Sequence, residues 1–239
     1  PLFTTRLIGP RIGIEEMLFF LRGDTDSKKL EDKNIFIWKG NTTREFLDKR
    51  GLHHLPEGDM GKGYGFQLRN FGGSLDKSGF DQLKYLIENI RKNPGDRRHI
   101  MSYWNPDQVL NEAALPPCHL LFNCQVSNGK LNGAFYMRSS DAILGLPTNV
   151  VGYAFLLHLL AKLTGYEVGQ LVYKAADCHI YLNHLACVDE LIKRTPKPFP
   201  LFKFKKEFST LEEALELTWN DMEIIGYEHC GKLKFDMAI

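Results

Sequence analysis

Residues 115–149 read LPPCHLLFNCQVSNGKLNGAFYMRSSDAILGLPTN, and they predict the centre of the fold. Apolar runs over 120–126 and 131–137 flank Ser127-Asn128-Gly129-Lys130, a combination typical of two strands joined by a hairpin turn. Polar groups gather at the open end of this hairpin. Cys118-His119 precedes the first strand, and the run from Arg138 to Asn149 follows the second. The sequence therefore predicts a nucleophile, an anion-binding pair and base-reading groups close together.

The rest of the chain predicts several helices around this hairpin. We expect them over 14–21, stopped by Gly23, from a capping box at 42–45 to Gly51, over 80–90 before Asn93-Pro94-Gly95, and over 150–163. The last run is apolar nearly all round, which predicts a buried helix. Further strands are expected over 171–173 and 202–204. Because helices and strands do not alternate regularly, the pattern indicates an α+β fold. No linker or repeat interrupts residues 1–239, which predicts one domain.

Composition excludes several classes of function. The 239 residues carry a net charge of +1, so there is no bulk attraction to nucleic acid or anionic membranes, and an anion must be held by a local arginine cluster. No apolar run is expected to approach the roughly 20 residues of a membrane span. Five cysteines without CxxC spacing argue against a disulfide framework and a zinc site, and favour a reducing compartment. Because the chain starts at Pro1 without a methionine, we expect N-terminal sequence to be missing.

Cys118 has two interpretations. A lone cysteine is usually a small buried hydrophobe. Two prolines before Cys118, His119 after it and arginines nearby favour instead a reactive thiol, because cationic neighbours favour a thiolate. Cys124 falls on the apolar side of a predicted strand and is expected in the core.

Two arginine-containing pairs also have two interpretations each. Arg138-Ser139 and Arg97-Arg98 are either surface pairs or anion-binding groups, since a guanidinium and a hydroxyl both suit phosphate.

Two more groups of polar residues leave alternatives open. Asp177, His179 and Tyr181 share one face of an extended segment, where the last two could be a core pair or bind sugar hydroxyls. Glu15 and Glu16 precede an apolar run. Spacing alone favours an exposed position in the first helical turn over a buried acid suited to proton transfer.

Taken together, the motifs resemble the thymidylate synthases, a family of folate-dependent enzymes that methylate dUMP. The resemblance covers essentially the whole chain, and the combination of Pro-Cys-His at 117–119 with Arg-Ser at 138–139 is highly specific. Further matching segments are Pro1–Thr5, Ile37-Trp38, Asn41, Arg44–Asp48, Tyr64–Gln67, Arg97-Arg98, Leu144–Pro147, Asn149, Asp177, His179, Tyr181 and Met237–Ile239.

The resemblance implies a mechanism. The Cys118 thiolate would add to C6 of uracil, and C5 would then attack the one-carbon unit of 5,10-methylenetetrahydrofolate. Glu16 would organise water and move protons around O4, and Tyr64 would support the water network that removes the C5 proton. Asn149 would read the uracil edge, because an amide offers both a donor and an acceptor. The other catalytic residues that the resemblance implies are His119 and Asp141.

The resemblance also assigns binding residues and partners. For dUMP these are Arg138 and Ser139 at the 5′-phosphate, Arg97 and Arg98 reaching it from the partner subunit, His179 and Tyr181 at the ribose hydroxyl, and Gln67. For folate they are Ile37, Trp38, Asn41, Asp141, Leu144, and Ala238 in a C-terminus that closes over the pocket.

The implied fold is a single domain with a mixed, twisted sheet, covered by helices on one face and forming a homodimer interface. A cytoplasmic location is expected, with no metal, membrane or required nucleic acid.

Departures from the family pattern leave a second reaction open. Met137 stands where the family usually has Gln, Thr148 where it has Phe, Leu68 where Trp is common, and Ala175-Ala176 where Gly-Gly is common. Basic or aromatic folate-loop residues are also missing near Gly9-Pro10. These changes make room for dUMP 5-hydroxymethylation, in which water rather than hydride captures the methylene intermediate. Asn149 favours uracil in both reactions, because cytosine-directed relatives carry Asp there. A decayed nucleotide- or RNA-binding module is disfavoured, because five residues suited to catalysis occur together: Cys118, His119, Glu16, Tyr64 and Asn149.

Overall fold

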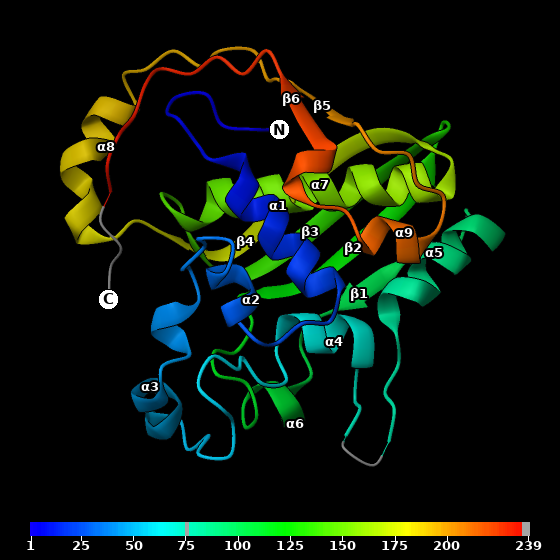
Figure 1. Cartoon of the computed structure of the whole chain (residues 1–239). Helices are drawn as coiled ribbons and strands as arrows, with labels where there is room; N and C mark the ends of the chain where they lie inside the picture. Colours follow the sequence, from blue (N-terminus) through cyan, green and yellow to red (C-terminus); the bar gives the residue numbers. More distant parts are fainter. Residues whose placement is uncertain (75–76, 236–239) are drawn as a thin grey trace.

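The computed structural model describes residues 1–74 and 77–235, and it is an α+β structure built on a mixed sheet (Figure 1). Its strands are β1 (Ile100–Ser102), β2 (His119–Ser127), β3 (Lys130–Asp141), β4 (Glu167–His179), β5 (Leu201–Phe204) and β6 (Met222–Ile225). Its α-helices are α1 (Pro10–Leu21), α2 (Lys28–Glu31), α3 (Arg44–Lys49), α4 (Tyr64–Asn70), α5 (Gln82–Lys92), α6 (Pro106–Val109), α7 (Gly145–Thr164), α8 (Leu185–Leu191) and α9 (Leu211–Leu215). Short 3₁₀ turns cover Lys39–Asn41, Leu182–His184 and Trp219–Asp221.

The predicted hairpin is confirmed and is longer than expected. β2 and β3 pair antiparallel, and their turn places Asn128 at φ 51° and Gly129 at φ 73°. Two positive φ values in a two-residue loop match the right-handed twist of the flanking strands, and Asn-Gly adopts them readily. The hairpin pairing ends at His119 and Met137, but β3 continues to Asp141 by pairing with the next strand, so it carries the polar run 138–141 as part of the sheet.

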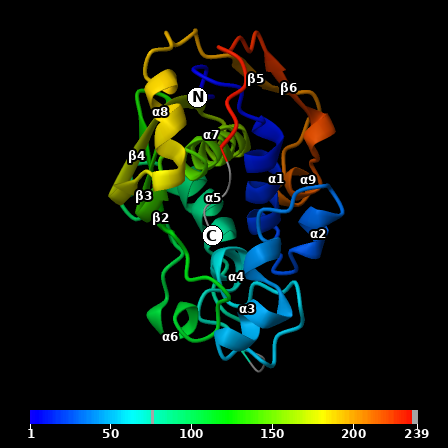
Figure 2. The ribbon, with the colours of Figure 1, turned by 90° about the vertical axis from the view of Figure 1, so that its left-hand side faces the viewer.

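The main sheet is mixed, in the order β1-β2-β3-β4, and a separate ribbon pairs β5 with β6. β3 and β4 are parallel, so the chain must cross over between them, and α7 makes this crossing. Viewed from the side, the sheet, α7 and α1 lie in successive layers (Figure 2). The two helices approach closely at Gly13 and Gly152: a Cβ on Gly13 would lie 2.5 Å from the carbonyl oxygen of Thr148.

The α7 helix corrects one expectation. With 20 residues and a mean hydropathy of 1.3 over its most apolar window, it is long and apolar enough to cross a membrane by length and composition. The helix nevertheless lies between the sheet and α1, and 72% of that window is buried. Burial of this extent accounts for its apolar surface as that of a core helix.

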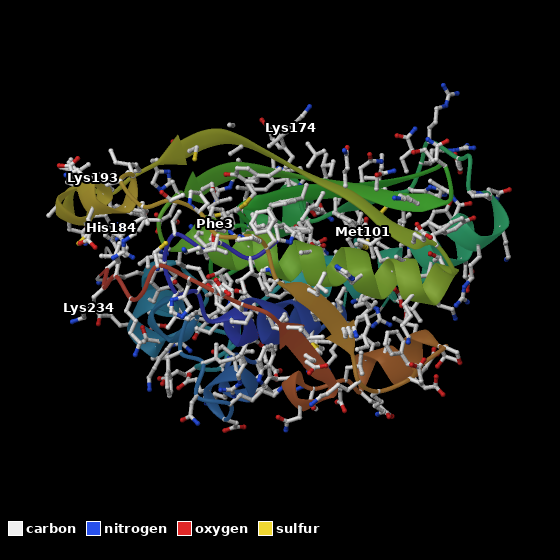
Figure 3. The ribbon with its side chains drawn as sticks, turned by 90° about the horizontal axis from the view of Figure 1, so that it is seen from above. Phe3, Met101, Lys174, His184, Lys193 and Lys234 are labelled. Carbon is white, nitrogen blue, oxygen red and sulfur yellow. The ribbon has the colours of Figure 1, made fainter. Side chains whose placement is uncertain are left out.

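The two faces of the sheet differ. Phe122, Cys124 and Phe135 are buried on the face toward α7, where the ring of Phe135 stacks on Tyr153 with centroids 4.0 Å apart. Cys124 therefore lies in the core, as predicted. On the other face Leu121 and Val172 are exposed, and Lys174 lies on the same outer side (Figure 3).

Other predictions needed adjustment at their ends. α1 begins four residues early, at Pro10, because proline is well tolerated in the first helical turn. α5 begins at Gln82 after an Asp81 cap. Phe80 therefore lies outside it, 53% exposed, and its ring packs on Tyr85. The helix predicted after residues 42–45 is present, but its cap lies one residue later than the predicted capping box: the Thr43 hydroxyl accepts a hydrogen bond from the backbone N–H of Phe46, and Thr42 instead donates to the Trp38 carbonyl oxygen.

Candidate active site

A cavity of about 220 Å³ opens where the hairpin, α1, α4 and α7 meet. Most of its walls are residues that the sequence singled out. They are Glu16, Trp38, Tyr64, Cys118, His119, Met137, Ser139, Ser140, Asp141, Gly145, Asn149, His179 and Tyr181.

Cys118 lies directly before β2, and hydrogen bonds to its own backbone and to the two prolines before it hold this segment in place. Its backbone N–H donates to the Tyr64 hydroxyl at 3.0 Å. Before it, Arg138 donates to the carbonyl oxygens of Pro116 at 2.8 Å and Pro117 at 2.9 Å. A break in the strand register between His119 and Leu121 lets the chain turn here, as bulges beside active sites commonly do. The thiol of Cys118 is half-buried and lines the cavity.

Glu16 faces the cavity from the middle of α1, and this corrects the expectation of an exposed first-turn residue. The helix begins six residues earlier, so Glu16 lies beyond its first turn, and Glu15 is only 3% exposed. The indole N–H of Trp38 donates to Glu16 Oε1 at 2.8 Å. Burial raises the pKa of Glu16 to about 7, an effect that the Trp38 hydrogen bond opposes. A carboxyl group with such a pKa can both give and take a proton near neutral pH.

The buried His119 and the half-buried Asn149 form a polar pair in the cavity wall. His119 Nε2 lies 3.3 Å from Asn149 Oδ1, and His119 Nδ1 lies 3.1 Å from the Tyr153 hydroxyl. Burial lowers the pKa of His119 to about 4, so the imidazole is neutral at physiological pH. The Asn149 amide nitrogen donates to the Met137 sulfur at 3.5 Å.

His179 and Tyr181 line the cavity instead of forming a core pair. His179 Nδ1 contacts Asp177 Oδ1 at 3.0 Å, and its ring lies edge-on to Tyr181 with centroids 5.1 Å apart. Tyr181 is 41% exposed. The common face predicted for the three residues therefore carries a solvent-accessible group of hydrogen-bonding side chains.

A second cavity of about 340 Å³ adjoins the first. The two share the walls Glu16, Asp141, Gly145, Asn149 and Tyr181. The second is otherwise lined by Ile37, Asn41, Leu115, Leu144 and Thr148. A molecule bound in one cavity would therefore lie directly against a molecule bound in the other.

Asp141 stands between the two cavities because the turn into α7 fixes it. Its Oδ1 accepts a hydrogen bond from the Ile143 N–H at 2.8 Å, and Arg6 donates to the Ile143 carbonyl oxygen. The Thr148 hydroxyl donates a hydrogen bond to the Leu144 carbonyl oxygen at 3.2 Å.

Some predicted residues lie elsewhere. Gln67 is fully buried and donates to Lys62 O and Gln108 Oε1 instead of lining either cavity. Arg138 lies behind Cys118 and beside the Trp104 ring, outside both sets of lining residues. Arg97 and Arg98 border a separate, open depression. Ala238 lies outside the described residues.

Sequence reasoning missed four lining residues: Leu115, Ser140, Gly145 and, as a contact of Asn149, Met137. Their signal was position, because Ser140, Gly145 and Met137 are each next to a predicted site residue, and Leu115 is three residues before Cys118. In residues 1–74 and 77–235, no group of three or more His, Cys, Asp or Glu side chains is placed to hold a metal ion.

Comparison with known proteins adds a family to this geometry. The family model described as thymidylate synthase matches residues 1–239. The chain is 43% identical over 246 residues to a bifunctional dihydrofolate reductase-thymidylate synthase of Paramecium tetraurelia, and 44% identical over 248 residues to one of Leishmania major. It is 40% identical over 246 residues to a thymidylate synthase of varicella-zoster virus (strain Dumas).

Coverage differs between these relatives. All of this chain is matched in each case, but it spans 52% and 47% of the two bifunctional proteins and 80% of the viral one. The chain thus spans about half the length of the bifunctional relatives.

Proposed function

The chain belongs to the thymidylate synthase family, and from this premise we propose that it methylates dUMP at C5, using 5,10-methylenetetrahydrofolate as one-carbon donor. One observation carries the proposal. Cys118, Glu16, Tyr64 and Asn149 line one cavity, and a second cavity of about 340 Å³ adjoins it and shares five of its lining residues.

Cys118 supplies the nucleophile. Its sulfur adds to C6 of the uracil, which makes C5 nucleophilic toward the one-carbon unit. At the end of the cycle the S–C6 bond breaks, and the C5–C6 double bond and the free cysteine are restored. Covalent catalysis of this kind divides one difficult substitution into an addition and an elimination. The contacts from Tyr64 and Arg138 that position the Cys118 segment support this role.

Glu16 relays protons, and Tyr64 orders the water that accepts one. A carboxyl group with a pKa raised to about 7 can relay protons through water to and from O4 as charge develops there. Burial raises the pKa of Tyr64 well above its usual range, so the phenol stays protonated. Its oxygen accepts from the Cys118 N–H and would order the water that takes the proton from C5.

The second cavity suits the folate donor. Ile37 and Leu144 offer apolar walls, and Asn41 and Asp141 offer polar groups at their edges, a combination that fits a flat heterocycle with hydrogen-bonding edges. When bound, methylenetetrahydrofolate supplies both the carbon and the hydride of the new methyl group. Trp38 lines the nucleotide cavity and holds Glu16, so its folate role remains a prediction.

Hydroxymethylation of dUMP is the second candidate, and Met137 and Thr148 are the observations that favour it. Both are departures from the family pattern that line the cavities, and Met137 contacts the base-reading Asn149. The two reactions differ in what reaches the methylene carbon. Hydride gives dTMP and dihydrofolate, whereas water gives the hydroxymethyl nucleotide and leaves tetrahydrofolate.

We also propose a homodimer in which Arg97 and Arg98 serve the partner's phosphate site, together with the local Arg138 and Ser139. The exposed Arg97-Arg98 pair and the uncovered outer face of the sheet support this assembly. The cysteines, Cys118, Cys124, Cys178, Cys187 and Cys230, are all free thiols, which is compatible with the cytoplasmic location that we propose.

Product analysis tests the function. Purified protein is incubated with dUMP and methylenetetrahydrofolate, the nucleotide product is identified by mass, and dihydrofolate is followed by absorbance. We expect dTMP and dihydrofolate in equal amounts. A hydroxymethyl product without dihydrofolate would establish the second candidate, and no product together with no covalent adduct of 5-fluoro-dUMP would reject both.

A further inference from the structure

Three side chains form a continuous line of hydrogen bonds that runs from the wall of the nucleotide cavity into the core. The Tyr153 hydroxyl lies 3.1 Å from His119 Nδ1, and His119 Nε2 lies 3.3 Å from Asn149 Oδ1. Asn149 and Tyr153 are one turn apart on α7, so the same helix holds both ends of the line. Tyr153 is fully buried and lines neither cavity.

The chemistry of these groups fixes the direction of each hydrogen bond. A carboxamide oxygen only accepts, so His119 Nε2 must carry the proton that it shares with Asn149 Oδ1. In a neutral imidazole the other nitrogen then has a lone pair, and Nδ1 must accept from the Tyr153 O–H. The Tyr153 hydroxyl thereby stabilises one of the two histidine tautomers.

A contact on the other side of the amide agrees with this direction. The Asn149 nitrogen lies 3.5 Å from the thioether sulfur of Met137, which is a weak acceptor. Rotating the amide by half a turn would place its oxygen against that sulfur and its N–H group against the Nε2–H of His119. Neither pair could form a hydrogen bond, so the neighbours select one orientation of Asn149.

This orientation matters for a pyrimidine. Uracil offers an acceptor at O4 and a donor at N3, whereas cytosine offers a donor at N4 and an acceptor at N3. We propose that Tyr153 is a specificity-determining positioning residue, which fixes the His119 tautomer and through it the amide orientation of Asn149 that matches uracil. The inference rests on the proposed function for its substrate, but the tautomer that it assigns does not.

The ring and the hydroxyl of Tyr153 have separable roles. The ring stacks on Phe135 and lies near Phe122, with centroids 5.5 Å apart, and phenylalanine would retain this packing. Tyr103 provides a matched control. Its ring is equally buried and lies 5.8 Å from the His119 ring. Its hydroxyl interacts with the Tyr153 hydroxyl but makes no hydrogen bond to the imidazole, so Tyr103→Phe removes a neighbouring hydroxyl and leaves the donor to His119 Nδ1 in place.

The tautomer is measured directly by ¹⁵N chemical shifts of histidine-labelled protein at neutral pH, with the His119 signals assigned through His119→Gln. In the parent and in Tyr103→Phe we expect His119 to be protonated at Nε2. In Tyr153→Phe we expect a mixture of tautomers, because Nδ1 has lost its donor. Retention of the pure Nε2–H form in Tyr153→Phe would overturn the proposal.

Selectivity supplies the second measurement, because loss of packing alone would not change it. We expect Tyr153→Phe to reduce the preference for binding dUMP over dCMP about tenfold, the effect of one buried hydrogen bond, and Tyr103→Phe to leave it unchanged. A preference within about twofold of the parent, or an equal loss in Tyr103→Phe, would contradict the assignment. If the parent itself binds no dUMP, the proposed function fails, and the tautomer measurement still decides the role of Tyr153.

Discussion

The Cys118 cavity and the Arg97-Arg98 depression are built in opposite ways. In the cavity, burial favours the neutral form of both Glu16 and His119. It raises the pKa of Glu16 to about 7 and lowers the pKa of His119 to about 4. In the depression, the Arg98 side chain is 83% exposed and pairs with Asp96 at 2.8 Å. This difference fits the proposed function: groups proposed to act on an uncharged base can be fixed inside one chain, whereas the arginines proposed for a dianionic phosphate keep their charge in water.

The largest effect is expected at the centre of the buried region. Cys118→Ser should abolish turnover and leave dUMP binding within about tenfold, because a hydroxyl occupies nearly the same volume but is a far weaker nucleophile than a thiolate. Steady-state rates and equilibrium binding measure the two quantities separately. Turnover within tenfold of the parent would remove Cys118 from its role, and Cys124→Ser, in the core, controls for general effects of the substitution.

Mixing two inactive variants tests whether Arg98, in the exposed Arg97-Arg98 depression, contributes to the active site of a partner subunit. We expect Arg98→Glu and Cys118→Ser each to be nearly inactive alone. In a hybrid dimer, one site would combine an intact Cys118 with an intact Arg98 from its neighbour, and the other site would carry both defects. Activity should therefore return, up to about half that of the parent per hybrid. If exchange of subunits is verified and no activity returns, Arg98 acts within its own chain.

The sequence predicted the buried region better than its surroundings. The hairpin, the short helix α3 and the apolar crossover helix follow from local turn chemistry and periodicity, and all are present, although the cap of α3 lies one residue later than predicted. The residues from Pro117 to Asn149 are close together in sequence, so a single hairpin brings them together. Their convergence could be predicted because it depends on few long-range contacts.

The sequence could not predict how deeply a side chain is buried or which way it points. Spacing favoured an exposed Glu16, because the packing of α1 against Trp38 and α7 cannot be read from one helix alone. Gln67 lies in a motif with Tyr64, but the turn of α4 directs it into the interior, where Gln108 meets it. The role of the Tyr153 hydroxyl depends on three contacts between β2, β3 and α7, and no spacing signals it.

The ionisation of Glu16 can be detected as a pH-dependent contribution to stability. Because its pKa rises from 4.5 to about 7 on folding, the native state binds more protons between those values, and its stability falls as pH rises through that window. Glu16→Gln removes this contribution, so relative to the parent it should gain roughly 3 kcal/mol in free energy of unfolding between pH 4.5 and pH 8.

The difference between variant and parent is the informative quantity. His119 has the opposite slope between about pH 4 and 6.5, since its pKa is lowered on folding, and this term cancels in the comparison. Urea unfolding at several pH values provides the measurement, with Glu88→Gln, at an exposed position of α5, as the control. A pH-independent difference for Glu16→Gln would show that the carboxyl group is not desolvated.

The smallest expected effect concerns which base the buried region accepts. Asn149→Asp should shift the preference from dUMP toward dCMP, because a carboxylate cannot donate to uracil O4 but can accept from the cytosine amino group. An unpaired polar group in a buried site costs roughly 1–3 kcal/mol, so we expect a ten- to hundredfold change in relative binding, measured by competition between the two nucleotides. The exposed region provides the contrast: Arg98→Ala should weaken both nucleotides equally, because a phosphate contact does not depend on the base. Unchanged selectivity in Asn149→Asp would show that Asn149 does not read the base, and altered selectivity in Arg98→Ala would remove the distinction between the two regions.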